Sequence, residues 1–302
     1  MTRHSAAHTS WRALGPDAQG TVFMLGNAAL HGAMAYLVRL IGDSLPIIEI
    51  IFLRGVIVAA TIVPLALWCG AWRTQRFDLH LARGAGTFVG MSCFYWSYAH
   101  LPLGEATALM FTMPLFLIVL ARVFMNESVG WRRTAATVVG FLGVIAVVKP
   151  GFAEFRVGLL VPLLMGFTDA VTATVIKRLT RTDRLLTIMF YMSVVTLAIS
   201  ILPAYYAWVK PSGEVLVLVG AIAALTMLTQ LCYVSAFRVG EMTAVAPINY
   251  VQIPLMGMIG YLAFAELPDI SAGIGAAIIV ASTLYIGHRE ARLRRAALAK
   301  PS

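Results

Sequence analysis

Runs of about 20 apolar residues recur along the whole chain, and this recurrence constrains the fold more than any other feature. A run of that length, wound into a helix at about 1.5 Å per residue, crosses the roughly 30 Å hydrocarbon core of a bilayer. Because backbone polar groups cannot be left unpaired in lipid, we expect helices and not strands. The ten predicted spans are residues 20–38, 46–69, 83–101, 106–124, 134–148, 157–176, 185–206, 215–237, 243–264 and 270–287.

Composition also indicates that the solvent is a bilayer. Of the 302 residues, 60% are hydrophobic and 12% are charged, which is more apolar surface than a soluble domain can bury. The connectors are too short for a soluble domain, and no small-residue cleavage site follows the first span, which we expect to be retained. The predicted parts are an N-terminal tail (1–19), two five-helix units (20–148 and 157–287) and a basic C-terminal tail (288–302).

The 23 Lys and Arg residues are divided unequally between the two sides of the membrane. With a cytoplasmic N-terminus, 18 of them fall in cytoplasmic tails and connectors and only 4 in the opposite connectors. This asymmetry follows the positive-inside rule and predicts an inner-membrane protein with both termini in the cytoplasm. Topology therefore accounts for the net charge of +9, and we predict no nucleic-acid partner.

The two halves of the chain repeat one another. "LGEATALMF" (103–111) matches "VGEMTAVAP" (239–247) at a shift of 136, and Glu127 matches Glu266 at a shift of 139. At a shift of 138, Ala35 aligns with Ala173, Arg39 with Lys177, Phe52 with Phe190, Val56 with Val194, Tyr95 with Tyr233 and Ser97 with Ser235. These matches predict a repeat of five helices.

Because five is odd, the second unit must enter the membrane from the opposite side to the first. Many secondary transporters use inverted repeats of this kind to build two related gates around one site at the bilayer midplane. The alternative is a duplication that only enlarged a helical bundle.

Residues 95–151 combine a small-Thr-Ala opening, a proline within the helix, a glutamate at its end and "GFLGV" in the helix that follows. Residues 233–269 show a similar pattern. In these features the chain resembles the EamA-type unit of the drug/metabolite transporter superfamily, over residues 20–287. The resemblance implies an all-α inner-membrane carrier of ten transmembrane helices, five plus five inverted, with a central cavity and alternating access.

The resemblance leaves the substrate open, since family members move amino acids, metabolites, nucleotide derivatives, vitamins or drugs. We expect a secondary carrier that exports a small amphiphilic metabolite, such as an amino acid or a compound derived from one. The alternatives are an uptake carrier of the S-adenosylmethionine or riboflavin type and a flippase for a lipid-linked sugar. The expected partners are a small-molecule substrate and membrane lipid, while proton coupling and a homodimer stay open.

An integral-membrane enzyme is the competing class of function. The sequence contains no His-Glu-x-x-His, no Gly-x-Ser-x-Gly, no pair of intramembrane aspartates, no phosphate-binding loop and no haem attachment motif. The three cysteines are odd in number, which argues against a disulfide framework. We therefore predict no catalytic residues, no metal and no cofactor.

Two ionisable residues lie in the middle of predicted spans. Asp169 interrupts the apolar stretch "LLMGFTDAVTATVI" (163–176), and in the register that aligns Ala35 with Ala173 its counterpart is His31. A carboxylate near the bilayer centre costs roughly 2.5–3.5 kcal/mol on insertion scales, so it usually faces a bundle interior or a cavity. We expect both residues to contact substrate or exchange a proton, the alternative being a structural bond between helices.

Arg54 lies within the second predicted span, in "FLRG", which resembles the Leu-Arg-Phe element of the family's second helix except that Gly55 replaces the Phe. Glu49 is five residues away, about 140° around the helix, and does not face it. Arg54 therefore needs another partner, either a substrate carboxylate or an acid elsewhere, unless its long side chain extends to the membrane surface.

A polar stripe in the eighth predicted span indicates a wet cavity. Thr226, Gln230, Tyr233 and Phe237 are spaced at i, i+4, i+7 and i+11 and so share one face of a helix. Tyr95 and Tyr98 in the third predicted span form the counterpart in the first half. Interhelical hydrogen bonding is the alternative role for such stripes.

Prolines predict discontinuities in the fourth and ninth spans. Pro114, Pro247 and Pro254 each remove a helical hydrogen bond and free the carbonyls of Met110, Thr243 and Tyr250. We interpret these prolines as hinges. Asn249 and Gln252, which lie between the last two, are predicted to contact a polar substrate, whereas Glu127 and Glu266 are predicted to be loop or cap residues.

Overall fold

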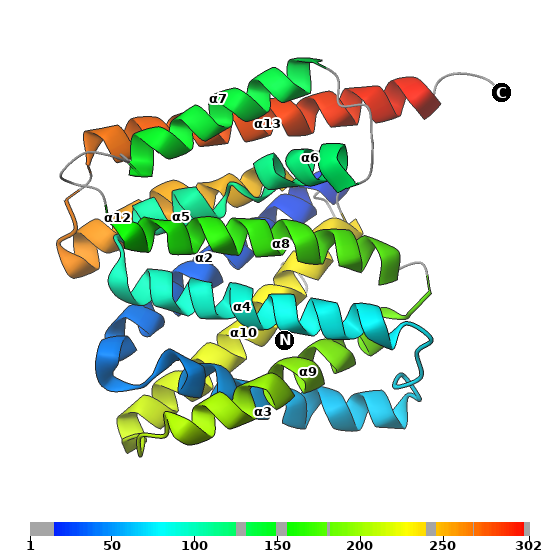
Figure 1. Ribbon diagram of the computed structural model, residues 1–302, viewed down its shortest axis with the longest axis vertical. Coiled ribbons are helices and arrows are strands. Elements are labelled where there is room, and N and C mark those ends of the chain that lie inside the picture. The colour runs from blue at the N-terminus through cyan, green and yellow to red at the C-terminus, as the bar shows by residue number, and fades with distance from the viewer. Residues whose placement is uncertain are drawn as a thin grey trace, which may run out of the picture.

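The computed structural model of the chain describes residues 15–124, 131–148, 156–179, 182–239, 246–267 and 269–298 (Figure 1). Within these ranges every regular element is a helix, as predicted. The α-helices are α2 (Pro16–Ile41), α3 (Ile47–Trp68), α4 (Phe77–His100), α5 (Leu103–Met110), α6 (Met113–Phe124), α7 (Trp131–Val148), α8 (Leu160–Leu179), α9 (Leu185–Tyr206), α10 (Gly213–Val239), α12 (Gln252–Phe264) and α13 (Ile270–Leu298). The 3₁₀ helices are η1 (Gly42–Ser44), η2 (Val157–Leu159) and η3 (Ala246–Val251).

Each of the ten predicted spans corresponds to a helical segment, with differences in detail. The fourth span is two helices, because α5 ends at Met110 and α6 begins at Met113. The ninth begins as η3 and continues as α12. The last helix continues to Leu298, so the segment predicted as a tail from residue 288 extends α13. The third begins at Phe77 and not at residue 83, because polar residues outside the apolar run extend the helix.

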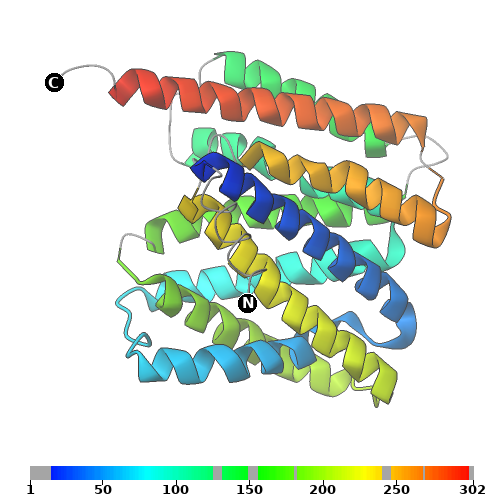
Figure 2. The same ribbon diagram turned by 180° about the vertical axis from the view of Figure 1, so that it is seen from behind.

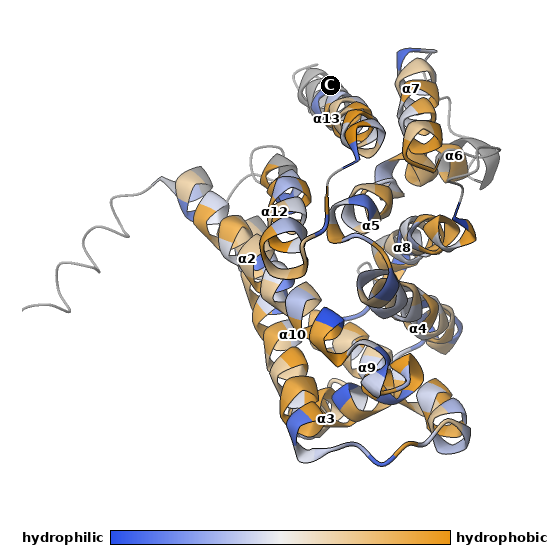
Figure 3. Cartoon of the chain, turned by 90° about the vertical axis from the view of Figure 1, so that its left-hand side faces the viewer, coloured by the Kyte–Doolittle hydropathy of each residue, from blue (hydrophilic) through white to orange (hydrophobic). Residues whose placement is uncertain are grey.

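Six segments are long and apolar enough to cross a membrane by length and composition: 18–44, 47–68, 103–120, 157–176, 185–206 and 213–233. Shorter apolar helices cover residues 134–148, 248–264 and 270–286. Figure 3 shows hydrophobic colour along most of the helical ribbons and hydrophilic colour mainly near the connectors. The protein is therefore an integral membrane protein with many spans.

Corresponding helices of the two halves make corresponding contacts. α2 of the first repeat corresponds to α8 of the second, and α4 corresponds to α10. α2 lies against α10, and α8 lies against α4 in the same way. α3 contacts α9, α5 contacts α12 and α7 contacts α13, so each of these helices meets its own counterpart. Figures 1 and 2 show α7 and α13 together at one edge of the molecule and α3 and α9 at the opposite edge. Two inverted five-helix repeats, related by a pseudo-twofold axis, produce this exchange of contacts.

The connectors gather at two ends of the bundle. The Glu266 end contains the connector between α12 and α13, and the Asp183 end contains the connector between α8 and α9. The two ends have corresponding contacts. At the Glu266 end, Glu49 Oε2 at the start of α3 accepts a hydrogen bond from Val209 N at 3.0 Å. At the Asp183 end, Asp183 Oδ2 just before α9 accepts a hydrogen bond from Thr74 Oγ1 and lies 2.8 Å from His80 Nε2. In each case an acid at the start of α3 or α9 binds the connector that follows the other helix.

The burial pattern supports the repeat register that aligns Ala35 with Ala173. Val22 of α2 and Leu160 of α8 correspond in this register, and both are exposed. The pair Ala28 and Gly166, about 120° around the same helices from the first pair, is buried in both repeats. The lipid-facing and interior-facing sides of α2 and α8 are therefore equivalent.

Candidate functional site

Asp169 lies at the tenth of the 20 positions of α8 and faces the interior of the bundle. Phe167 and Val171, which point roughly 160° away from it around the helix, are exposed on the outer face. A Cβ added to Gly90 of α4 would lie 3.4 Å from Asp169 Oδ1, so the carboxylate approaches the α4 backbone where no side chain intervenes. No hydrogen-bond or ion-pair partner of this carboxylate is found among the described residues.

His31 also faces the interior, from the middle of α2. It is half-buried, and its imidazole meets the edge of the Phe94 ring with centroids 6.1 Å apart. Phe94 lies on α4, which also carries Gly90, so α4 is close to both ionisable residues. The prediction that His31 and Asp169 occupy equivalent interior positions is consistent with this placement, while their contact with substrate stays a prediction.

Arg54 is the eighth residue of α3 and is only 8% exposed, so it does not extend to a membrane surface. Arg54 Nη2 lies 3.1 Å from Met91 Sδ, and its Nε is buried without a hydrogen-bond partner. The Glu49 carboxylate accepts a hydrogen bond from Val209 N and forms no ion pair with Arg54. Among the residues that the structure describes, the Arg54 guanidinium has no carboxylate partner.

The two tyrosines of α4 are in the core and not on an open surface. Tyr95 and Tyr98 are each 2% exposed. The Tyr98 hydroxyl lies 3.2 Å from Thr107 Oγ1 in α5, and the Tyr95 hydroxyl lies near Thr226 of α10. Tyr98 therefore ties α4 to α5, and its proposed contact with substrate has no support from its surroundings, whereas Tyr95 has Arg54 as an electrostatic neighbour.

The stripe on α10 changes from buried to exposed along the helix. Ile222 and Ala223 are fully buried on this face, near the Glu266 end, whereas Gln230 is exposed and Tyr233 is 42% exposed, nearer the Asp183 end. Tyr233 also interacts electrostatically with Asp169. Tyr233, in the exposed part of the stripe, therefore lies near the carboxylate, while the contact of Gln230 and Tyr233 with substrate stays a prediction.

The predicted discontinuity in the fourth span is a complete break in the helix. Thr112 N bonds to Leu109 O at 3.2 Å in a turn that separates α5 from α6. Pro114 is therefore the second residue of α6 and not a kink inside one helix; it has no amide hydrogen to offer to Met110 O. A Cβ at Gly166 would lie 3.3 Å from Met110 O, so the break contacts α8 one turn before Asp169.

The ninth span changes helix type at the equivalent place. Pro247 lies in η3, and Pro254 is the third residue of α12, where a missing amide hydrogen costs nothing. Pro254 is exposed and lies in the first turn of α12, directly after the segment that changes helix type, and its role as a hinge stays a prediction. Pro247, in the segment that changes type, stays a hinge prediction.

An amide cluster joins this segment to α2. Asn249 Oδ1 accepts hydrogen bonds from Asn27 Nδ2 at 3.3 Å and from Gln252 Nε2. Sequence reasoning predicted Asn249 and Gln252 but missed Asn27, although Asn27 lies one turn before His31 on the same interior face of α2. Both bonds are accepted by Asn249 Oδ1, so they orient the Asn249 and Gln252 side chains, and contact of either with substrate stays a prediction.

The Glu266 end is closed by an arginine and a glutamate. Arg39 Nη2 donates to Glu266 Oε1 at 2.7 Å, and Glu266 Oε2 accepts from Leu103 N at 2.8 Å. Arg39 Nη1 also donates to three carbonyl oxygens, those of Tyr98, Ala99 and Leu101. Glu266 is a loop residue as predicted, but its role in joining the repeats was missed.

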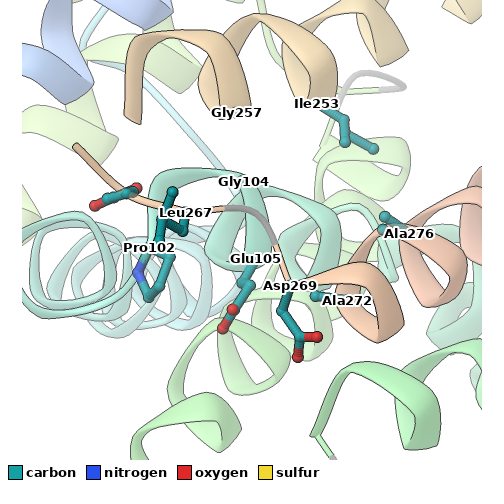
Figure 4. Close-up of a pocket in the computed structure, with 11 residues that line it drawn as sticks. Pro102, Gly104, Glu105, Ile253, Gly257, Leu267, Asp269, Ala272 and Ala276 are labelled. Atoms are coloured by element: carbon teal, nitrogen blue, oxygen red, sulfur yellow. The ribbon is translucent and has the colours of Figure 1, made fainter. Parts of the chain in front are cut away.

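Figure 4 shows a pocket at the same end, between α5, α12 and α13. The Glu105 and Asp269 side chains approach one another at its rim, and Glu105 is paired with Arg156. None of the predicted site residues lines this pocket. The pocket therefore belongs to the closed end and not to the surroundings of Asp169.

Some predicted residues fall outside the part of the chain that the structure describes. Glu127 and Thr243 lie in such segments, as does the Phe237 side chain. Within the described residues, no group of three or more His, Cys, Asp or Glu side chains is placed to hold a metal ion.

Comparison with known sequences finds the EamA-like transporter family, whose profile matches residues 18–149 and 156–287. The chain is 30% identical to an S-adenosylmethionine uptake transporter of Rickettsia felis, over 83% of this chain and 86% of that protein. It is 30% identical to a riboflavin transporter of Vibrio cholerae, over 74% of this chain and 76% of that protein. It is 28% identical to a pseudopaline exporter of Pseudomonas aeruginosa, over 84% of this chain and 90% of that protein.

A solved crystal structure has a similar fold. The two structures agree with a TM-score of 0.60 at 18% sequence identity, over 90% of this chain and 97% of the other. At this identity the likeness concerns the fold alone.

Proposed function

The chain belongs to the EamA-like transporter family, and we propose that it is a secondary carrier for a small amphiphilic metabolite with a cationic group. The substrate enters between the two repeats and binds near Asp169. It is released on the other side when the repeats rock about their pseudo-twofold axis.

The placement of Asp169 carries this proposal. An ionised carboxylate in the middle of a membrane-spanning helix is costly unless a cation, a proton or water stabilises it. Asp169 faces inward beside Gly90 and has no cationic partner among the described residues. An ammonium or sulfonium group on a substrate would compensate this charge, and a proton would do so when the site is empty.

The relatives support import as the direction of transport, in place of the export expected from the sequence. S-adenosylmethionine, which the Rickettsia felis protein takes up according to its name, carries a sulfonium and an ammonium group. Export is the second candidate, because one relative is an exporter of pseudopaline. We propose the cytoplasm for both termini, from the distribution of Lys and Arg.

The direct test is transport by the purified protein in liposomes. Labelled S-adenosylmethionine, riboflavin and L-phenylalanine are supplied outside in one experiment and trapped inside in another. Flux of a cation-bearing compound above protein-free liposomes supports the proposal. Flux of riboflavin alone would exclude a cation as the recognised group. Metabolite profiling of cells with and without the protein, in both medium and cytoplasm, gives cargo and direction together.

A further inference from the structure

Arg54 and Asp169 contact different sides of one helix, α4. Successive residues of an α-helix are about 100° apart, which places Gly90, next to Asp169, roughly 100° from Met91, next to Arg54. The cation-binding carboxylate and the buried guanidinium are therefore set apart around α4.

An aromatic ring lies between these two sides. Phe94 is about 40° from Gly90 around the helix and about 60° from Met91. Its ring meets His31 of α2 on the interior side, at a centroid separation of 6.1 Å. Moving around α4, the interior therefore presents a carboxylate, an aromatic ring and a guanidinium in that order.

The guanidinium is incompletely satisfied. Its Nε is buried without a hydrogen-bond partner, and Nη2 is directed at the Met91 thioether, which is a weak acceptor. Removing a charged group from water without a partner of opposite charge is costly. The described residues supply no carboxylate, so within that part of the chain the guanidinium is short of one anion.

A carboxylate matches this site best. Two guanidinium nitrogens bind the two oxygens of a carboxylate in parallel hydrogen bonds, a geometry that a lysine cannot reproduce. The Glu49 carboxylate is unsuitable because it accepts a bond from Val209 N and lies about 140° around α3 from Arg54.

We infer that Arg54 binds the carboxylate of the transported molecule, on the side of Phe94 opposite to Asp169, so that the carrier selects zwitterions. This inference rests on the proposed carrier function. Besides the cationic group, the substrate carboxylate is then a second group that the carrier recognises, through Arg54.

Matched pairs of probes test the inference. S-adenosylmethionine is compared with decarboxylated S-adenosylmethionine, and L-phenylalanine with phenethylamine, for binding to the purified full-length protein. Each pair differs only in the carboxylate. We expect the unmodified protein to bind the acid at least about 10-fold more tightly than the amine, as for a charge-assisted hydrogen bond.

Substitution of Arg54 should remove this preference. Arg54→Gln is expected to weaken binding of the acid about 10-fold or more and to leave the amine unchanged, while Arg54→Lys retains part of the preference. Arg76→Gln, at an exposed arginine just before α4 that lies 3.9 Å from Asp78 near the Asp183 end, is the control and should change neither.

The outcomes separate the two proposals. Failure of the unmodified protein to bind any probe counts against the proposed function. Equal binding of acid and amine by the unmodified protein overturns the Arg54 inference alone. The Arg54 inference is also overturned if Arg54→Gln keeps the full preference for the acid. Where the glutamine variant does not fold, the same result for Arg54→Lys overturns it.

Discussion

Arg39 and Glu266, 227 residues apart in the sequence, form an ion pair of 2.7 Å that joins the two repeats at one end of the bundle. Arg39 is also held by three carbonyls of its own repeat, whereas Glu266 belongs to the other repeat and reaches across to Leu103 N. Opening this end therefore requires Glu266 to leave, while Arg39 can stay in place.

Glu266→Gln is predicted to open the Glu266 end more often. A partly buried ion pair contributes about 1 kcal/mol, which corresponds to a change of about fivefold in the open population. The measurement is the thiol-labelling rate of the reporter Ala272→Cys, in a chain whose three natural cysteines are replaced. Ala272 is buried at the pocket in this end.

The control for this experiment is Asp78→Asn. It removes an exposed pair with Arg76, at 3.9 Å, near the opposite end of the bundle. Labelling should be unchanged by the control. Equal labelling with and without Glu266→Gln would show that the ion pair does not hold this end closed.

Gly143→Ala is predicted to destabilise the contact between α7 and α13. Its Cβ would lie 2.9 Å from Gly275 O and 2.9 Å from the Ile278 side chain, so the helices must separate. Overpacking of this kind costs typically about 1–3 kcal/mol and should lower the melting temperature in detergent. Gly273→Ala on the same α13, where nothing lies within 4 Å, should leave the melting temperature unchanged or slightly higher. The same melting temperature for both variants would contradict this packing.

Gln230→Ala is predicted to raise the KM for transport about 2- to 10-fold, the cost of one neutral hydrogen bond. Gln230 is exposed on the inner stripe of α10, while the neighbouring Leu231 is 63% exposed on the outer side. Leu231→Ala should therefore leave KM unchanged. If the leucine variant raises KM as much as the glutamine variant, the stripe does not line the route of the substrate.

The helices, and the correspondence between the helices of the two repeats, could be predicted from the sequence. Apolar runs locate the spans, and a register read from pairs such as Ala35 and Ala173 agrees with the observed burial of α2 and α8. The boundaries are less predictable, because a helix can continue through polar residues beyond the bilayer, as at Phe77 and beyond residue 288.

The interior placement of Asp169 and His31 could also be predicted, because a charge within an apolar span has to face away from lipid. Other contacts could not. Nothing in the spacing of Arg39 and Glu266 indicates that they meet, since tertiary packing brings them together. Asn27 was recognisable by its position one turn before His31, but a lone amide carries a weaker signal than a charge.

The prolines illustrate a limit of local reasoning. A proline removes the same hydrogen bond wherever it occurs, so sequence alone does not distinguish a break from a helix start. Pro114 follows a turn and Pro254 lies in the first turn of α12, whereas Pro64 and Pro203, which were not predicted as hinges, lie inside α3 and α9.

The proposed function depends on binding of the substrate's cationic group by the Asp169 carboxylate. It is tested most directly by the initial rate of S-adenosylmethionine transport into liposomes containing Asp169→Asn, measured over a range of pH. The control is Phe167→Leu, two residues away on the outer face of the same helix. We expect a rate at least about 10-fold lower for Asp169→Asn, at equal protein content and thermal stability, and an unchanged rate for the control. An unchanged rate and pH dependence for Asp169→Asn would contradict this role of the carboxylate.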